Sequence, residues 1–401
     1  MLPEGWKLVR LGDIAQISSG GTPDRSQARY WNGNIPWVTT GEIQFNTITD
    51  TSEKITAEGL KNSSAKLFPP GTLLMAMYGQ GKTRGQVAKL GIAATTNQNS
   101  AAILLDNEHD PDFYLHYLAS RYDDIREFGN SGGISHLNAG LLRQIEVPTG
   151  PIQVQRSMAD IFSAWDVAIA ITEKLLVNAQ LTRQITSQTL LSGQRRLQHK
   201  TTWSRRRLAD LISESRVPGS PGSIARKLTV KLYGKGVVAK DERRHGSEAT
   251  AYYRRRAGQF IYSKLDFLNG AFGVVPEHLD GYESTLDLPA FDVRGVVDSR
   301  WLLYYVSREN FYKSLLGLAT GGRKARRVNP TDLLKISIDY PELEEQKAIA
   351  DAIDFALEDE RKRAAMLHML RTEKQALMAD LLSGKRRVPL PEKAAATQEP
   401  A

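Results

Sequence analysis

The sequence contains two copies of one long segment, and this internal repeat constrains the fold more than any other feature. Residues 155–196 align without a gap onto residues 346–387, at a constant offset of 191. Both copies open with Gln, continue to Ala-Asp and close with Leu-Leu-Ser-Gly-x-Arg-Arg. Upstream the similarity persists with a drifting offset, as between Trp6 and Trp203. The chain is therefore a tandem repeat whose insertions and deletions are confined to the part of each copy that precedes the ungapped segment.

The ungapped segments have the composition of long helices. They are rich in Gln, Ala, Leu, Glu and Arg, and they contain no proline and no glycine before the terminal Ser-Gly. Apolar residues recur at nearly heptad spacing, as in Ile161, Ala168 and Leu175. Gly193 and Gly384 stand where a C-terminal glycine cap belongs, followed by arginines that suit the helix dipole. We predict two helices that pack on each other along an apolar seam.

The connection between the copies determines the predicted layout. A helix of some 40 residues spans roughly 60 Å, and the joint at residues 193–202 is short. The first helix therefore carries the chain away from the first domain, and the second helix returns. We predict an α+β fold with two mixed α/β domains separated by two long antiparallel helices, a coiled-coil spacer with pseudo-twofold symmetry.

The domains that precede the helices have a mixed α/β pattern. Turn-bounded apolar runs predict strands at residues 72–78, 86–89, 101–105, 259–263 and 291–294, and helices at 111–127 and 299–316. The predicted division is a first domain at 1–152, a central helix at 153–196, a second domain at 197–341, a C-terminal helix at 342–387 and a tail at 388–401. The tail is rich in Pro, Ala and Glu, and we expect it to be disordered.

Positive charge is concentrated in the second domain. The chain has a net charge of +8, but residues 1–152 hold 13 basic and 15 acidic residues, whereas residues 200–340 hold 25 and 15. Such an excess is typical of a surface that binds a polyanion, although a solvated basic surface would have the same composition. Charge alone leaves both interpretations open.

Several classes of location and chemistry find no support in the sequence. There is no cysteine, so disulfides and thiolate metal sites are excluded. There is no run of eighteen apolar residues of the kind a membrane span needs, and the N-terminus lacks the apolar core of a signal peptide. We expect a cytoplasmic protein without a membrane partner.

Three strings resemble catalytic motifs. Residues 76–83 satisfy a permissive P-loop pattern, but glycines and a β-like run follow Lys82 where a phosphate-binding helix should begin. A turn between strands is the better interpretation. Ser131 stands between glycines like a nucleophile, yet a helical sequence precedes it and the second repeat has Thr320 at the matching position. Asn329-Pro330 lacks the second proline and the aromatic residue of adenine methyltransferases, which favours a turn or helix N-cap. The sequence predicts no catalytic site.

Polar and basic residues beside glycine-rich turns are the candidates for contacts to DNA. Arg and Lys pair with guanine edges and phosphates, and Asn and Gln pair with adenine edges. In the first domain the candidates are Gln80, Lys82, Thr83, Arg84, Gln86, Asn97, Gln98, Asn99, Ser131 and His136. In the second domain they are Lys235, Lys240, Arg243, Arg244, His245, Arg323, Lys324, Arg326 and Arg327. The last four follow a Gly-Gly turn and form the strongest local signal, with a solvated charged loop as the alternative.

Several motifs together resemble the specificity subunits of type I restriction–modification systems. They are the opening Leu-Pro-Glu-Gly-Trp-Lys-x-x-x-Leu-Gly-Asp of Leu2–Asp13, the strand and turn that follow Pro70, the Gln-rich helix starts at Gln155 and Gln346, and the Leu-Leu-Ser-Gly-x-Arg-Arg helix ends. The resemblance covers residue 2 to about residue 388, although the segment before Gln155 is a loose version of the usual Pro-rich, Glu-Gln helix entry.

The resemblance implies a non-catalytic subunit that reads a bipartite, asymmetric target in double-stranded DNA through two target-recognition domains. It implies that the long helices dock two modification subunits, which bind S-adenosylmethionine, and that restriction subunits using ATP and Mg join them. The chain itself is expected to bind no cofactor and no metal. Two other classes stay open: a stand-alone bivalent DNA-binding or scaffold protein, and a P-loop ATPase that uses Lys82.

Overall fold

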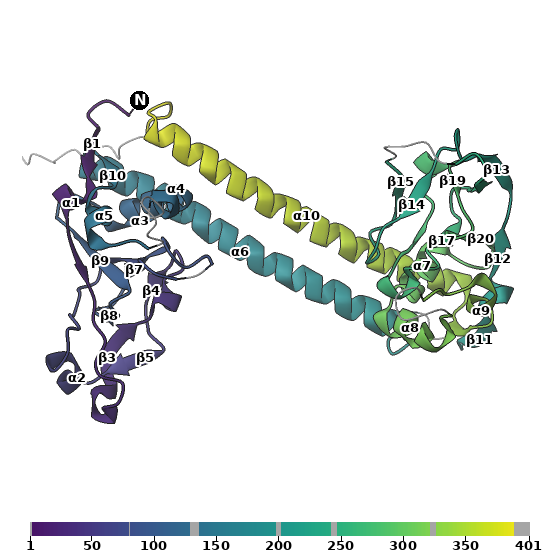
Figure 1. Cartoon of the computed structure of the whole chain (residues 1–401), viewed down its shortest axis with the longest axis horizontal. Helices are drawn as coiled ribbons and strands as arrows, with labels where there is room; N and C mark the ends of the chain where they lie inside the picture. The colour runs from purple at the N-terminus through teal and green to yellow at the C-terminus, as the bar shows by residue number, and fades with distance from the viewer. Residues whose placement is uncertain are drawn as a thin grey trace, which may run out of the picture. The chain divides into compact units, whose positions relative to one another are not determined.

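The computed structural model of the chain describes residues 2–79, 81–128, 136–197, 202–241, 247–320 and 326–388. The chain divides into two compact units. Unit 1 comprises Met1–Glu173 and Met366–Ala401, and unit 2 comprises Lys174–Ala365. Each unit therefore holds one strand-rich domain together with a part of each long helix (Figure 1). The predicted tail lies outside the described residues beyond Val388.

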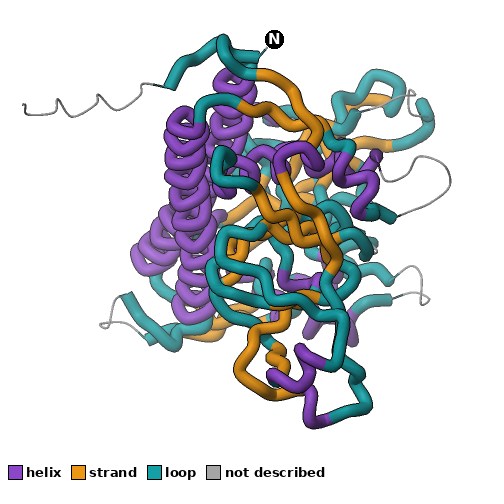
Figure 2. The backbone as a smooth tube through the Cα atoms, turned by 90° about the vertical axis from the view of Figure 1, so that its left-hand side faces the viewer, coloured by secondary structure: helices purple, strands orange, loops and turns teal. Residues whose placement is uncertain are grey.

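The described strands of unit 1 form three sheets. Figure 2 colours the strands of the chain orange and its helices purple. A five-stranded sheet has the order β2-β9-β6-β7-β4, a three-stranded sheet has the order β5-β3-β8, and β1 pairs with β10. Only β3–β8 and β4–β7 are parallel pairs among these. The strand bounds are β1 Lys7–Arg10, β2 Ala15–Ser19, β3 Trp31–Val38, β4 Thr47–Ile48, β5 Glu53–Ile55, β6 Leu73–Ala76, β7 Val87–Leu90, β8 Thr95–Thr96, β9 Ser100–Leu105 and β10 Glu146–Thr149.

Short helices complete the domain of unit 1 and connect its sheet to the long helix. The bounds are α1 Leu11–Ile14, α2 Ala57–Lys61, α3 Pro111–Ser120, α4 Tyr122–Phe128 and α5 Ala139–Arg143, with 3-10 turns η1 Ala28–Tyr30 and η2 Thr40–Glu42. The helix predicted at 111–127 is thus two helices. Phe113, Tyr114 and Leu118 of α3 are fully buried and share one core with Met158 and Phe162 of the first long helix. This shared core joins the domain to the helix.

Unit 2 repeats the arrangement with different strand lengths. Its main sheet has the order β12-β20-β17-β18, and it is accompanied by β13-β16-β19, by the ribbon β14-β15 and by the pair β11-β21. The strand bounds are β11 Ser204–Arg207, β12 Ile212–Ser215, β13 Pro218–Pro221, β14 Leu228–Val230, β15 Val237–Ala239, β16 Ala251–Arg254, β17 Phe260–Tyr262, β18 Phe272–Val274, β19 Glu283–Ser284, β20 Ala290–Val293 and β21 Ser337–Tyr340. The helical bounds are α7 Ser299–Val306, α8 Glu309–Ser314, α9 Pro330–Leu333, η3 Leu208–Asp210, η4 Phe267–Asn269, η5 Glu277–Leu279 and η6 Leu315–Leu318. The helix predicted at 299–316 is likewise divided.

The main sheets of the two units correspond strand by strand. The order β2-β9-β6-β7 of unit 1 has the same chain sequence of strands as β12-β20-β17-β18 of unit 2. A matching main-chain bond follows in each repeat, since Leu137 N donates to Met77 O and Val328 N donates to Lys264 O, both at 3.0 Å. The tandem repeat read from the sequence is therefore a structural repeat.

The two long helices are α6 Ile152–Leu191 and α10 Leu343–Leu382, each of 40 residues. Within unit 1, Asp166 pairs with Lys374 and Glu173 pairs with Arg371. Within unit 2, Arg183 pairs with Glu360 at 2.6 Å. From Asp166 to Glu173 the partners on α10 fall from Lys374 to Arg371, so the helices are antiparallel in unit 1, as predicted.

Both helices end at the predicted glycines. Gly193 and Gly384 have φ angles of +73° and +72°, a left-handed conformation that glycine adopts without the usual steric cost. Arg195 N then bonds to Thr189 O at 3.0 Å, and Arg386 N bonds to Asp380 O at 3.2 Å. The repeated Ser-Gly-x-Arg-Arg string is thus a helix stop, used twice.

None of the helices in the described part of the chain combines the length and the hydropathy that a bilayer span requires.

Candidate nucleic-acid interface

The turn between β6 and β7 carries the first group of predicted residues. These strands pair antiparallel, with Leu73 opposite Lys89, and the turn closes through Gly85 N to Ala76 O at 2.9 Å. Lys82 lies in this turn and is exposed, and no helix begins there. The P-loop geometry is therefore absent from residues 81–90, and the prediction of a turn between strands is confirmed.

Helix α4 holds this turn in place. The guanidinium of Arg126 donates to Gly81 O at 2.6 Å and to the hydroxyl of Tyr122, and that hydroxyl donates to Lys82 O. The Tyr122 ring also packs nearly perpendicular to the Phe45 ring, with ring centroids 5.3 Å apart. Charge-assisted bonds to main-chain carbonyls fix the turn without using the Lys82 side chain. Sequence reasoning missed Tyr122 and Arg126, whose spacing of four on a helix could have indicated a shared face.

Arg84 differs from its predicted role. Its side chain is buried, and its guanidinium donates to Arg126 O at 3.4 Å. The strand β7 that follows is buried on both sides, so the residues next to it turn inward. Arg84 is therefore a buried residue that stabilises the turn. Lys82, by contrast, is exposed, and Thr83 and Gln86 are half-buried.

The Asn97–Asn99 loop lies beside the same turn, because Met77 N donates to Asn99 O at 2.9 Å. Asn97 shapes this loop: its amide oxygen accepts from Asn99 N at 3.0 Å, and its amide nitrogen donates to the Thr40 hydroxyl at 3.0 Å. Gln98 accepts from the Thr22 hydroxyl. The adenine-reading role predicted for Asn97 therefore competes with internal bonds. Gln98 is exposed, and Asn99 is half-buried.

His136 and Tyr78 form a stacked pair at the end of β6. Their ring centroids are 4.9 Å apart with an interplanar angle of 13°, and Tyr78 is 40% exposed. His136 was predicted and Tyr78 was not, although it directly precedes the glycine-rich turn. The structure thus brings together Lys82, Asn99 and His136 from three separate segments. Gln80 and Ser131 lie outside the described residues.

In unit 2 the segment equivalent to the Lys82 turn is 263–271, because it joins β17 to β18. Lys264 and Asn269 are the polar candidates in it, and the sequence reasoning missed both. The local sequences of the two turns are unrelated, which is why these residues were missed. Matching the two copies strand by strand identifies them. The predicted Arg327 belongs to the same site, because Val328 N bonds to Lys264 O at 3.0 Å.

The residues at the two ends of the segment with the predicted basic run pair with each other. Thr320 and Arg327 exchange two main-chain hydrogen bonds of 2.9 and 2.8 Å, and Arg326 and Arg327 are exposed. Asn329 is the N-cap residue of α9 with Pro330 at its first turn, which confirms the cap interpretation. Arg323 and Lys324 lie outside the described residues, as do Arg243, Arg244 and His245.

Lys235 and Lys240 belong to the β14–β15 ribbon. Lys235 lies in its turn, and Lys240 follows its second strand, where its amide donates to Lys227 O at 2.8 Å. Both side chains are exposed. Arg255, by contrast, is fully buried and donates to Ser215 O, Leu288 O and the Ser284 hydroxyl. Burial lowers the pKa of Arg255 to about 10. This arginine is structural and is unavailable to a ligand.

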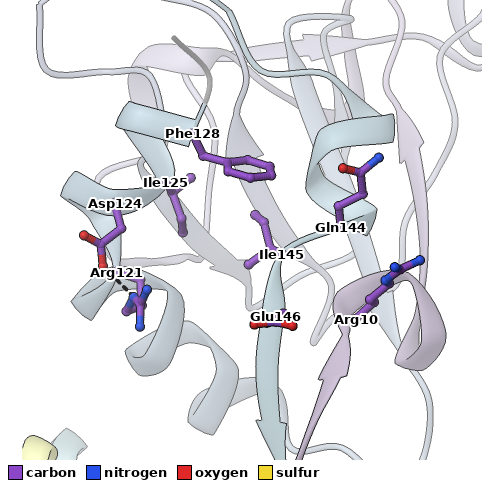
Figure 3. A pocket seen from close by; sticks show the side chains of 8 residues that line it. All are labelled: Arg10, Arg121, Asp124, Ile125, Phe128, Gln144, Ile145 and Glu146. Atoms are coloured by element: carbon purple, nitrogen blue, oxygen red, sulfur yellow. Dashed lines mark ion pairs between the residues drawn. The ribbon is translucent and has the colours of Figure 1, made fainter. Parts of the chain in front are cut away.

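Figure 3 shows a hollow of unit 1 between α4 and the start of β10. Ile125, Phe128 and Ile145 form its apolar part. Its rim consists of Arg10, Arg121, Asp124, Gln144 and Glu146, with Arg121 and Asp124 paired at 2.6 Å. Two arginines and two carboxylates balance in charge, so this rim does not favour a polyanion. None of the residues predicted to contact DNA lines it.

The glutamines at the helix starts have one structural role in both units. The Gln155 amide oxygen accepts from Asp110 N at 2.9 Å, and its amide nitrogen donates to Gly150 O at 2.7 Å. Gln346 makes the matching bonds to Asp298 N at 3.0 Å and Pro341 O at 2.8 Å. Asp110 and Asp298 cap α3 and α7. Each buried glutamine therefore ties its long helix to the domain in front of it.

Among the described residues, no three His, Asp or Glu side chains gather closely enough to hold a metal ion.

Comparisons of sequence and structure identify proteins that are similar to this chain. A family model described as the type I restriction modification DNA specificity domain matches residues 3–181. The MjaVIII specificity subunit of Methanocaldococcus jannaschii is 22% identical over 425 residues, covering 96% of this chain and 94% of that protein. The chain is thus similar to the specificity subunits of type I restriction–modification systems, through a family model over its first copy and through a relative over nearly its whole length. Alignments to two further members, the MjaIX subunit of the same archaeon and the EcoR124I/EcoR124II subunit of Escherichia coli, are 25% and 27% identical and cover 43% and 42% of this chain. They span only 40% and 43% of those proteins.

Solved structures of specificity subunits have the same fold over nearly the whole chain. The S subunit of M. genitalium aligns with a TM-score of 0.56 at 12% identity and covers 94% of this chain and 96% of its own. The HsdS subunit of Thermoanaerobacter tengcongensis aligns with a TM-score of 0.54 at 17% identity, covering 96% and 98%. The predicted fold class is thereby confirmed.

Proposed function

We propose that this chain is a specificity subunit that reads a bipartite, asymmetric sequence in double-stranded DNA, with one half read by each strand-rich domain, and that it has no catalytic activity of its own. The observation that carries this proposal is the duplicated site. The same turn of the same sheet occurs in both units, with Lys82, Asn99 and His136 near one copy and Lys264, Asn269 and Arg327 near the other. Two turns with the same backbone position but different side chains would contact different bases, so each unit would read a different half-site.

The long helices are the proposed docking surface for two modification subunits. Both helices leave large apolar side chains exposed, which soluble helices normally bury against a partner. The exposed residues are Val167, Ile171, Leu175, Val177, Leu181, Ile185, Phe355, Met366 and Met369. Phe355 is 79% exposed and borders a shallow groove with Ala352, Ala356 and Leu175. A methyltransferase that covers these side chains would leave the domain turns available for DNA.

Catalysis and cofactors are assigned to the partners in this proposal. The modification subunits would bind S-adenosylmethionine, and restriction subunits would use ATP and Mg. This chain would position them on its target. The turn at Lys82 is held by Tyr122 and Arg126 rather than by a helix N-terminus, which argues against a nucleotide site.

The direct test is to sequence the methylated bases of a host that expresses the chain together with its modification subunit. The expected motif has two different specified segments separated by a fixed gap of unspecified bases. A continuous or palindromic motif would contradict two distinct half-sites. Specific DNA binding by the chain in a host that encodes no modification subunit would instead favour the stand-alone binding protein. ATP binding by the purified chain that is abolished in Lys82→Ala would support the ATPase alternative.

A further inference from the structure

The β14–β15 ribbon of unit 2 displays one tyrosine in an unusual backbone conformation. Tyr233 lies in the turn of the ribbon with a φ of +58° and is 73% exposed. A left-handed conformation is unfavourable for a bulky residue and persists only where the surroundings impose it. Glycine would adopt it freely, and Gly234 and Gly236 in the same turn do so. The turn therefore presents a large aromatic side chain at a position that its backbone does not favour.

The surroundings that impose this conformation are main-chain bonds to the neighbouring turn. Tyr233 N donates to Asn269 O at 2.9 Å, and Gly234 N donates to Gly270 O at 2.8 Å. Asn269 and Gly270 belong to the segment 263–271, which corresponds to the Lys82 turn of unit 1. The ribbon tip is thus fixed to the part of unit 2 that the duplicated site assigns to DNA.

The ribbon itself is anchored rather than loose. Its strands pair Leu228 with Ala239 and Val230 with Val237, and Leu228, Val230 and Val237 are buried against Ile261 and Ala271 of the core. The residues of the tip, 231–235, are exposed. A two-stranded antiparallel ribbon has the width that the major groove of B-DNA accepts.

The Tyr233 side chain has no internal role among the described residues. No hydrogen bond, ion pair or ring contact links it to another described side chain. Phe45 of unit 1 is the contrast, because it has a similar φ of +57° but packs its ring against Tyr122. Exposed lysines flank Tyr233 at Lys231 and Lys235, whereas the nearest exposed acid along the chain is Asp241. The tip is therefore aromatic and locally cationic.

We propose that the ribbon tip enters a groove of the DNA, with Tyr233 contacting bases of the half-site read by unit 2 and Lys231 and Lys235 contacting the flanking phosphates. The phenol can donate a hydrogen bond to a base edge while its ring packs against a thymine methyl group. The lysines position the tip without reading sequence. This inference rests on the proposed DNA-recognition function and adds a specificity-determining residue to it.

The test uses the full chain in complex with its modification subunits and a duplex library with a randomised centre. Tyr233→Gly removes the side chain at a position whose φ suits glycine, so it should not lower the melting temperature. It should weaken binding to the selected duplex about ten- to a hundredfold, the range for removal of one base contact. It should also relax sequence preference in only one half of the motif. Lys231→Gln with Lys235→Gln should lower the slope of log affinity against log salt by about two units and leave the motif unchanged.

Val296→Ala is the matched control, because Val296 is also an exposed apolar residue of unit 2 but precedes α7, where its carbonyl accepts from Gln346 of α10. Its DNA affinity should match the wild type. Unchanged affinity and motif in Tyr233→Gly would overturn the inference, and so would a lowered melting temperature, which would make the ring structural. Failure of the wild-type complex to enrich any motif would refute the proposed function instead.

Discussion

The two units close the junction between a long helix and a strand-rich domain with different chemistry. In unit 2 the carboxylate of Glu345 is fully buried and accepts from Arg196 at 2.7 Å and from the Trp203 indole at 3.0 Å. The aligned positions in unit 1 are Val154, Arg387 and Trp6. There Trp6 packs on Phe113 at 5.4 Å, and Arg387 is almost fully exposed, 4.0 Å from an exposed Glu4.

The difference shows that the same junction between helix and domain can be stabilised in two ways. In unit 2 the arginine and the tryptophan belong to one continuous segment, so few degrees of freedom are lost when both converge on the buried carboxylate. In unit 1 the equivalent groups belong to the two ends of the chain, and apolar packing replaces the charge. Gly150 and Gly384 permit this packing, since a Cβ would lie 2.4 Å from the Trp6 ring in one case and 2.9 Å from Pro3 in the other. A buried ion pair tolerates the loss of a partner poorly, whereas an exposed one contributes little.

The largest expected effect is therefore at Glu345. Glu345→Ala removes the carboxylate that Arg196 and Trp203 share, and we expect unit 2 to lose about 3 kcal/mol of unfolding free energy. Glu4→Ala, the change at the corresponding pair of unit 1, should cost less than about 0.5 kcal/mol. Chemical unfolding measures both, and hydrogen exchange by mass spectrometry assigns each loss to a unit. Equal losses would show that the junctions do not differ as described.

The helix-start glutamines test the opposite expectation, that the units are equivalent. Gln155→Leu and Gln346→Leu each leave a partly buried main-chain N–H and a carbonyl without their side-chain partner, which costs about 2 kcal/mol. The two losses should agree in size, because the bonds match in number and length. Unfolding midpoints of the two variants provide the comparison. A loss in only one unit would mean that the second glutamine is replaceable by water.

The two units should differ in how much their basic residues contribute to the salt dependence of DNA binding. Reversing charge at Arg323, Lys324, Arg326 and Arg327 should lower the log–log salt slope by about one unit for each DNA phosphate that these side chains no longer neutralise. Lys82→Glu in unit 1 should lower it by about one unit at most, since Arg84 beside it is buried. Titrations of a fixed duplex at several salt concentrations measure the slopes. If the slope is unchanged in the fourfold variant, its basic run is a solvated loop.

The smallest expected effect is the acid sensitivity of two carboxylates. Burial would raise the pKa of Asp298, but hydrogen bonds from Arg300 and from the amides at the start of α7 outweigh it and lower the pKa. Asp166 of unit 1 behaves alike, since burial would raise its pKa but bonds from His116 and Lys374 outweigh this and lower it. A depressed pKa gives stability that is fully present above the ordinary value and is lost as the pH falls through the lowered value of the folded protein.

Asp298→Asn keeps a helix cap but removes the charge, so it should cost about 1 kcal/mol at neutral pH. Its melting temperature should begin to converge with that of the wild type below about pH 4, and the two should meet once the pH is below the lowered pKa of Asp298. Asp166→Asn should show the same convergence from a smaller difference, because Asp166 is half exposed. Melting curves across this pH range check both, and a difference that persists in acid would assign the effect to packing rather than to charge.

Much of the fold followed from the sequence because its signals are local or periodic. The ungapped repeat predicted two matching helices, and both occur with the expected glycine stops at Gly193 and Gly384. The turn at Lys82 was predicted from the glycines around it, and β6 and β7 pair across it. The division of the predicted helices after Ser120 and Val306 was missed, because no proline or glycine marks either break.

The candidate site was predicted less completely, because side-chain availability depends on contacts far away in the sequence. Arg84 and Asn97 have the residue types that read DNA, but one is buried beside α4 and the other bonds to Thr40. Lys264 and Asn269 carried no motif and gained significance only when the sheet order matched their turn to that of Lys82. Arg255 lies in a run of three arginines, yet it is fully buried and bonds to Ser215, Ser284 and Leu288, so only the tertiary structure shows that it is structural.

The sequence by itself determined the duplication, the helix lengths and stops, and the distribution of charge, since each depends on residue type and spacing along the chain. Only the tertiary structure decided that Glu345 closes one junction and Trp6 the other, and that Tyr233 is held outward at a ribbon tip. Residue type sets what a side chain can bond to, but the packing of distant segments sets whether that capacity is used internally or remains available to a partner.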